Sequence, residues 1–174
     1  MKSFFFFLVS LVILGSASEA LAADWWFVPW DRPGESEEIV YVDKSSLERI
    51  GRSGRITAWV WTVYRSDQSA ESGSYRSHKH RLIVDCDKKE AGADIGFLYS
   101  AYGGLIQQYR KSAPEMEPVV PESIRETVVL FVCSGGKQPP RVIPVYDPSR
   151  DFESRFAQRD RERKPIGNSA PNEK

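Results

Sequence analysis

Cysteine and histidine are both scarce in this chain, and their scarcity limits the metal and redox chemistry open to it. The sequence holds two cysteines, Cys86 and Cys133, and two histidines, His78 and His80. A redox-active pair would need a C-x-x-C spacing, which the two cysteines lack. On a strand the histidines would share one face, as a metal site needs, but no third ligand is evident. We therefore predict no metal and no cofactor, and place the histidines at a solvated strand end.

Signatures of catalysis and of phosphate binding are also missing. No G-x-S-x-G motif supports a serine nucleophile, and Gly103-Gly104 and Gly135-Gly136 are typical of turns rather than phosphate loops. The chain carries 24 basic and 24 acidic residues and no formal net charge. A neutral protein is a poor candidate for binding nucleic acid through its phosphates. The sequence thus predicts no catalytic residues and no nucleic-acid partner.

The first 22 residues have the features of a secretory signal peptide. Lys2 gives a positive start, an apolar run extends from Phe4 to Leu14, and Ala20-Leu21-Ala22 provides a small-x-small cleavage site. The apolar run is too short for a stable membrane span, so a retained anchor helix is the less favoured alternative. No cysteine lies near the cleavage point, so nothing in this segment suggests a lipid anchor. We expect an exported chain of about 150 residues, enough for one domain with a sizeable core.

Export gives the two cysteines a structural role. An exported chain with two thiols usually oxidises them to one disulfide, here Cys86–Cys133. For a loop of this length, chain entropy gives about 4 kcal/mol of stabilisation. That is a large share of a typical net stability of about 5–15 kcal/mol.

Segments rich in β-branched and aromatic residues predict a sheet. The strongest is Arg55 to Arg65, where apolar residues on both faces favour a central strand covered, at least in part, on both sides. Asp43 to Gly51 has a capping residue and a terminal glycine, which predict a short turn of helix. Residues 66–74 are expected to form a small-polar loop. The other expected strands are Trp25–Trp30, Ile39–Val42, Tyr75–Cys86, Ile95–Tyr102 and Leu105–Tyr109.

Residues 121–133 are compatible with either a strand or a helix. Val128 to Val132 has the composition of a buried strand. Ser123 and Glu126, however, form a capping box, and Ile124, Val128 and Phe131 then share one helical face. We favour the helix.

Residues 137–174 are rich in proline and in charge, and they predict a tail that is largely disordered. Phe152 and Phe156 are four residues apart, which supports the alternative of a weak amphipathic helix over Ser149 to Arg163.

Aromatic and basic residues supply the candidate binding groups. The five tryptophans are compatible with a stacking surface for sugars or peptides, although a role in the core is favoured. A basic cluster on and beyond the strand 75–86 is compatible with an acidic partner, although solvated strand ends are favoured. Its members are Arg76, Lys79, Lys88 and Lys89, with Arg81 beside them.

The order and spacing of these landmarks resemble the surface-adhesin protein E family of exported Gram-negative proteins, over Trp25 to Ser134. The chain departs from the family pattern at Met116, where the family often has Trp, and at Glu122, where it often has Gly. It also lacks the lipidated cysteine of the best-known adhesins. The matching residues are Trp26, Tyr41-Val42-Asp43, Ser46, Gly51, Trp61, Tyr75-Arg76-Ser77, Lys79, Asp85-Cys86, Tyr102, Gly104, Pro118-Val119-Val120-Pro121, Ser123 and Cys133.

The resemblance implies an α+β fold, with a single antiparallel sheet of about five to six strands and a C-terminal helix tethered by the Cys86–Cys133 disulfide. The family domain would occupy residues 23–136, between the signal peptide (1–22) and the tail (137–174). The implied function is an exported, non-enzymatic binding protein of the periplasm or cell surface. Its protein partner would be a host matrix protein such as vitronectin or laminin. The alternative is a periplasmic structural or accessory protein that binds another envelope component.

Overall fold

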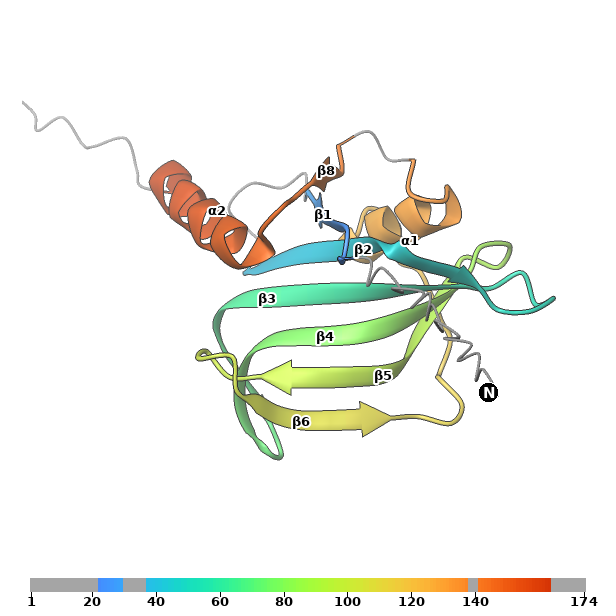
Figure 1. Cartoon of the computed structure of the whole chain (residues 1–174), viewed down its shortest axis with the longest axis horizontal. Coiled ribbons are helices and arrows are strands. Elements are labelled where there is room, and N and C mark those ends of the chain that lie inside the picture. The colour runs from blue at the N-terminus through green and yellow to red at the C-terminus, as the bar shows by residue number, and fades with distance from the viewer. Residues whose placement is uncertain (1–21, 30–36, 138–140, 164–174) are drawn as a thin grey trace, which may run out of the picture.

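The computed structural model describes residues 22–29, 37–137 and 141–163. Within these residues the chain forms one antiparallel eight-stranded sheet and two helices, so the predicted α+β class is confirmed (Figure 1). The elements are β1 (Trp25–Val28), β2 (Glu38–Arg49), β3 (Ile56–Ala70), β4 (Gly73–Asp85), β5 (Glu90–Tyr99), β6 (Leu105–Arg110), β7 (Glu117–Pro118), α1 (Ile124–Cys133), β8 (Ile143–Pro144) and α2 (Pro148–Arg163).

The sheet has more strands than the five to six expected, because two very short strands were not predicted. β7 pairs with the start of β5, and β8 pairs with β1 through Trp26–Pro144 and Phe27–Ile143. Strands of two residues depend on where the fold brings the chain, and composition does not reveal them. The remaining six correspond to the six expected strands.

β3 lies in the middle of the sheet, whose order is β6-β5-β4-β3-β2-β1-β8. Its Ala58 and Val60 belong to a core cluster with Phe131 of α1, and we call this side of the sheet the α1 face. On the other side, Val63 belongs to a cluster that Phe152 of α2 contacts, and we call this side the α2 face. The expected central strand, covered at least in part on both sides, is confirmed.

The helical turn expected after Asp43 is wrong, because this segment belongs to β2. The pairing of β2 with β3 shifts register between Asp43 and Glu48, which marks a β-bulge. The Asp43 carboxylate accepts a hydrogen bond from the Ser45 N–H at 3.0 Å. The Ser46 hydroxyl accepts one from the Trp59 N–H of β3 at 2.8 Å. Residues typical of a helix cap thus stabilise an irregularity in a strand instead.

The polar loop expected over residues 66–74 is also wrong. β3 continues to Ala70 and β4 begins at Gly73, with Gln68 opposite Tyr75. The two strands therefore extend as a hairpin beyond the core, where polar side chains are solvated on the strand pair. Gly73 has φ +128°, a conformation that side-chain-bearing residues rarely adopt, which fits a tight reversal there.

α1 is a helix, as the capping box predicted. The Ser123 hydroxyl accepts a hydrogen bond from the Glu126 N–H at 3.1 Å, and the Glu126 carboxylate reaches back to the Glu122 N–H at 2.7 Å. The helix ends at Cys133, which forms the predicted disulfide with Cys86. The buried side of the helix consists of Val128, Val129, Phe131 and Val132.

The chain beyond Gly136 does not follow the expectation of a largely disordered tail where the structure describes it. β8 joins the sheet, and α2 packs Phe152 and Phe156 against the α2 face. The helix over Ser149 to Arg163, the less favoured alternative, is the observed one. The expected signal peptide, except for Ala22, and residues 138–140 and 164–174 lie outside the described residues. The described residues contain two helices, α1 and α2. Neither of them is long and apolar enough to cross a membrane.

Candidate functional site

The part of the α2 face formed by β3 to β6 carries aromatic and cationic side chains in cross-strand rows. One row runs from Trp61 through Lys79 to Phe97, and the next runs from Trp59 through Arg81 to Ile95. Because side chains alternate along a strand, both rows project on the same side of the sheet. We call this surface the aromatic face, and define it by Trp59, Trp61, Lys79, Arg81, Phe97, Tyr99, Leu105 and Arg110.

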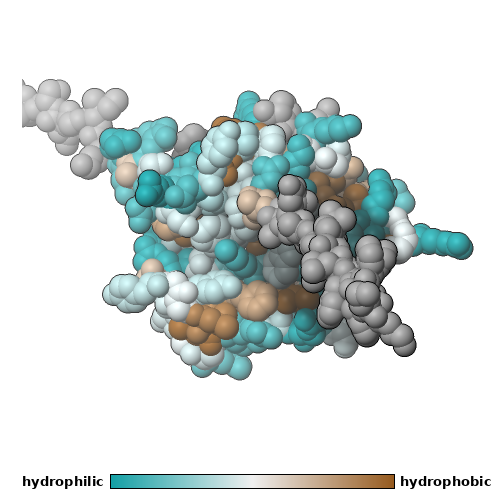
Figure 2. Space-filling view, viewed as in Figure 1, coloured by the Kyte–Doolittle hydropathy of each residue, from teal (hydrophilic) through white to brown (hydrophobic). Residues whose placement is uncertain are grey.

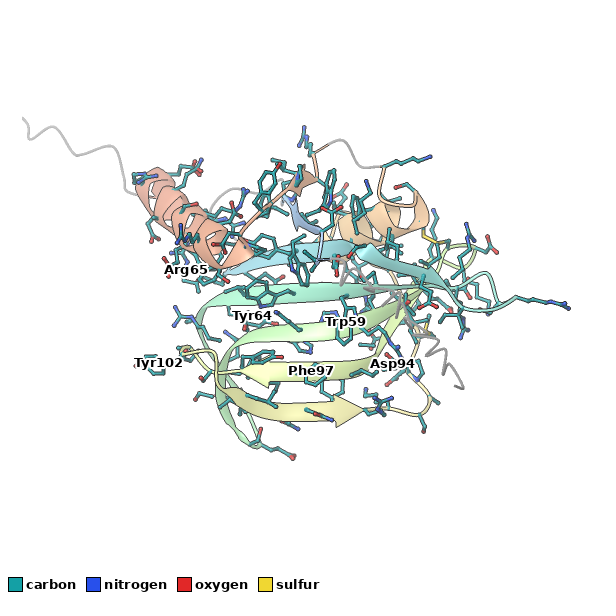
Figure 3. All side chains as sticks on the ribbon, viewed as in Figure 1. Trp59, Tyr64, Arg65, Asp94, Phe97 and Tyr102 are labelled. Carbon is teal, nitrogen blue, oxygen red and sulfur yellow. A yellow bond between two sulfur atoms is a disulfide. The ribbon has the colours of Figure 1, made fainter. Side chains whose placement is uncertain are left out.

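The rings of the aromatic face remain partly open to solvent. Trp59 and Phe97, labelled in Figure 3, are both half-buried, and their ring centroids lie 6.0 Å apart. Leu105 on β6 is 56% exposed, and Tyr102 in the turn before it is 99% exposed. Figure 2 shows apolar side chains at the surface in the lower part of the view, where Figure 1 places β5 and β6. Such a patch is available to a partner.

Lys79 lies at the centre of this surface, surrounded by aromatic rings. Its Nζ lies 4.5 Å from the centroid of the Trp61 ring, 5.6 Å from that of Trp25 and 6.0 Å from that of Tyr99. Burial lowers the pKa of Lys79 from its ordinary value. The rings favour the ammonium form through cation–π attraction, with about 0.5–2 kcal/mol per contact. The positive charge is therefore held in place and only partly hydrated.

A second cation on the aromatic face is already paired. The Arg81 Nε donates a hydrogen bond to Asp94 Oδ1 at 3.0 Å. This hydrogen bond lowers the pKa of the Asp94 carboxyl and raises that of Arg81. Arg110, which pairs with Ile95 on the same side of the sheet, is exposed. The aromatic face thus presents the positive charges of Lys79 and Arg110 to a partner, whereas Asp94 neutralises the charge of Arg81.

The structure does not gather the four predicted basic residues into one patch. Arg76 donates from Nε to the Tyr64 carbonyl at 2.8 Å, and its guanidinium pairs with Asp67 at 3.3 Å. Lys88 and Lys89 lie in the turn between β4 and β5, at the opposite end of β4 from Arg76. At a rise of about 3.3 Å per residue, roughly 30 Å of strand separates the two ends. Among these four residues, Lys79 alone belongs to the aromatic face.

The two histidines lie on the other side of β4 and are not at a solvated strand end as expected. The His78 Nε2 is hydrogen-bonded to the Tyr109 hydroxyl at 3.0 Å, and the two imidazole rings stack at 4.5 Å. Burial lowers the pKa of His78 to about 4 and that of His80 to about 3, so both are neutral at pH 7. Among the described residues, no group of three or more His, Cys, Asp or Glu side chains is placed to hold a metal ion.

Sequence reasoning missed Phe97 and Tyr99 as surface residues and favoured the core for all the tryptophans. Trp25 and Trp61 do pack against the core cluster of the α2 face. Trp59 instead pairs with Phe97 across the intervening strand β4. The signal in the sequence was the alternation of large apolar residues along β5, but the register that aligns β5 with β3 depends on the whole sheet.

The antiparallel sheet, the disulfide-tethered α1 and the aromatic face together define a small disulfide-bonded α+β domain with a candidate contact surface. The family model described as Surface-adhesin protein E matches residues 27–134. The chain belongs to this family of surface adhesins.

One solved structure similar to this chain is that of Haemophilus influenzae protein E. The two share 11% sequence identity with a TM-score of 0.45, over 65% of this chain and 88% of the other. No curated protein matches the chain in sequence.

Proposed function

We propose that this chain is an exported, non-enzymatic adhesin domain of a Gram-negative envelope, and that the aromatic face is its contact surface for host matrix proteins such as vitronectin and laminin. Membership of the surface-adhesin protein E family supports adhesion as the function. The observation that carries the choice of surface is the position of Lys79 among the rings of Trp61, Trp25 and Tyr99.

This arrangement suits binding to a protein with exposed acidic residues. Half-buried aromatic side chains such as Trp59 and Phe97 lose little conformational entropy on contact and bury a large apolar area. Lys79 is already partly desolvated, so an acidic group of the partner meets a charge that has less water to lose. The surface therefore combines apolar anchors with a fixed positive charge.

Replacement of the rings tests the proposal. We expect the Trp59→Ala, Phe97→Ala double variant to bind immobilised vitronectin or laminin at least about tenfold more weakly than the original protein, as is usual for interface anchors. Surface plasmon resonance measures the change, and circular dichroism checks the fold. The matched control is Lys88→Ala with Lys89→Ala, at the end of β4 away from Arg76, which is expected to leave binding unchanged. Equal losses in the two variants would contradict the choice of surface.

Cell location tests the adhesin function separately. An adhesin must be reached from outside, so membrane-impermeant labelling of intact cells is expected to modify the protein. Recovery of the protein solely in the periplasmic fraction would instead favour the alternative, an accessory protein that binds another envelope component. That result would contradict host adhesion whatever the ring variants show.

A further inference from the structure

A cavity lies on the α1 face, on the opposite side of the sheet from the aromatic face. Its volume is about 440 Å³, within the range of about 300–1,000 Å³ that is typical of small-molecule sites. Val60 and Leu82 line it from the sheet, and Val128 lines it from α1. All three side chains are buried members of the core cluster. The cavity therefore has an apolar side next to the core, at the end of α1 where the helix begins.

Polar groups enter this cavity from neighbouring strands. His78 and His80 line it from β4, and Tyr64, labelled in Figure 3, lines it from β3. The hydrogen bond to Tyr109 and the stacked rings hold His78 in position. In contrast, the Nδ1 atom of His80 is buried and has no hydrogen-bond partner within the described residues. A buried polar atom without a partner costs about 1–3 kcal/mol, so a ligand that supplies one gains affinity.

The cavity disfavours charge in its own side chains. Burial lowers the pKa of both histidines, which keeps the imidazoles neutral. Burial also raises the pKa of Glu38 and of Tyr64, which line the same space. All four shifts have the same physical cause, the loss of hydration around the charged form.

Among the described residues that line the cavity there is one arginine, and other groups already pair with it. The Arg125 guanidinium forms an ion pair with Glu117 at 2.7 Å and donates to the Ala91 carbonyl. An anionic ligand would therefore lose its hydration without gaining an unpaired cation. A cationic ligand would meet the neutral imidazole of His80, and burial raises the pKa of Glu38, the carboxylic acid among the described lining residues, which makes its charged form less favourable.

We infer that this cavity binds a small uncharged organic molecule that has an apolar body and a hydroxyl group, and that the His80 imidazole pairs with this hydroxyl. A hydroxyl both donates and accepts, so it satisfies either tautomer of a neutral histidine. The apolar body of the ligand leaves water for a space lined by Val60, Leu82 and Val128, which stabilises the complex in proportion to the apolar area of the ligand that is buried. This site is separate from the aromatic face and does not depend on adhesion.

Three related probes test the ligand class on the purified protein at pH 7. These are 2-naphthol, naphthalene without the hydroxyl, and 2-naphthoate with a negative charge. We expect 2-naphthol to bind with a Kd about fivefold to tenfold lower than that of naphthalene, the contribution of one hydrogen bond. We expect 2-naphthoate to bind more weakly than either. Titrations followed by amide chemical shifts in NMR spectra give each Kd and locate the site, with changes expected in β3, β4 and the first turn of α1.

Variants of the cavity test the roles of its residues. His80→Phe keeps a ring but removes the nitrogens. This variant is expected to bind 2-naphthol and naphthalene with about the same Kd. Ala93→Leu adds volume to a residue that lines the cavity, and is expected to abolish binding of both probes, with circular dichroism as the check on folding. The aromatic-face variant Trp59→Ala, Phe97→Ala serves as the control and should leave both Kd values unchanged.

Several results would overturn the inference. The ligand class is wrong if 2-naphthoate binds as tightly as 2-naphthol. The role of His80 is wrong if His80→Phe retains the preference for the hydroxyl. The site itself is wrong if no probe binds, or if the shift changes fall on the aromatic face. None of these results bears on binding to matrix proteins, so the two proposals fail independently.

Discussion

The two helices of this domain cover opposite faces of one sheet, and they are attached in opposite ways. α1 buries Val128, Val129, Phe131 and Val132, and a disulfide fixes its last residue to the end of β4. Among the residues of α2, Phe152 and Phe156 pack against the core cluster of the α2 face while remaining half-buried. α1 is thus part of the core, whereas α2 is a polar helix laid over an aromatic cluster.

Polar contacts also attach α2 to the sheet. The Tyr41 hydroxyl donates to Asp151 at 2.9 Å, and Asp151 also forms an ion pair with Arg155. The Arg155 guanidinium lies 3.5 Å from the centroid of the Phe27 ring. Exposed and half-exposed ion pairs contribute little, about 0–1 kcal/mol each. We therefore expect α1 to be required for the fold, and α2 to separate from the sheet at lower cost.

Removal of the disulfide is expected to have the largest effect on this difference. Cys86→Ser with Cys133→Ser should lower the free energy of unfolding by about 4 kcal/mol, because the unfolded chain regains the entropy of an open loop. Urea unfolding measures the change, and hydrogen exchange should show the loss of protection concentrated in α1 and β4. An unchanged unfolding midpoint, or losses concentrated in α2, would contradict the core role of α1.

Acid is expected to weaken the α1 face next. The pKa values of His78 and His80 are lowered to about 4 and about 3 in the folded protein, against about 6.5 in an unfolded chain. Between these values the unfolded state binds more protons, so the free energy of unfolding falls as the pH decreases below about 6.5. From pH 7 to pH 5 we expect a loss of about 3–4 kcal/mol for the two histidines together, at most about 1.4 kcal/mol per pH unit for each.

Other titrating groups act outside this pH range or in the opposite direction. The lowered pKa values of Asp85 and Asp94 cause a loss of stability only when the pH falls through and below about 4. The raised pKa of Glu38 favours the folded state on protonation and offsets part of the loss. Chemical unfolding at a series of pH values gives the profile, which should flatten in His78→Phe with His80→Phe. A profile that is equally steep in this variant would exclude the histidines as its cause.

Loss of the two phenylalanines should release α2 without unfolding the domain. For Phe152→Ala with Phe156→Ala we expect the free energy of unfolding to fall by about 2 kcal/mol, less than the usual cost for fully buried phenylalanines because both rings are half-buried. Hydrogen exchange of α2 amides should approach that of a free helix, while α1 remains protected. Simultaneous loss of protection in α1 would show that the two helices form one cooperative unit.

The same contrast explains how much of the fold could be predicted from the sequence. α1 was predicted because its determinants are local: the Ser123 cap and apolar residues at helical spacing. α2 was the less favoured alternative, because its own sequence is charged and its partners are distant. Tyr41 and Asp151 are separated by 110 residues. No local pattern identifies such a contact.

The candidate sites show the same limit. The alternation of side chains along β3 was predicted and is confirmed, but which strands lie beside β3, and in which register, follows from the assembled sheet. The prediction named Lys79 as a basic residue, and only the register shows that it lies between Trp61 and Phe97. His78 and His80 were predicted to be solvated because basic residues flank them. Alternation places Lys79 and Arg81 on the other face, and the histidines line the cavity.

The smallest expected effect concerns the residue that precedes the cap of α1. Glu122 has φ +58°, in the left-handed region that costs a side-chain-bearing residue about 1–2 kcal/mol. Glycine adopts this conformation without strain but gives the unfolded chain more freedom, at about 0.4–1 kcal/mol. Glu122→Gly should therefore raise the free energy of unfolding by about 0.5 kcal/mol, since the hydrogen bond from the backbone N–H of this residue to the Glu126 carboxylate is retained. Glu122→Ala, which keeps the strain, should give no gain. Urea unfolding of both variants measures the difference, and an equal gain in the two would show that the Glu122 side chain, not the backbone, is responsible.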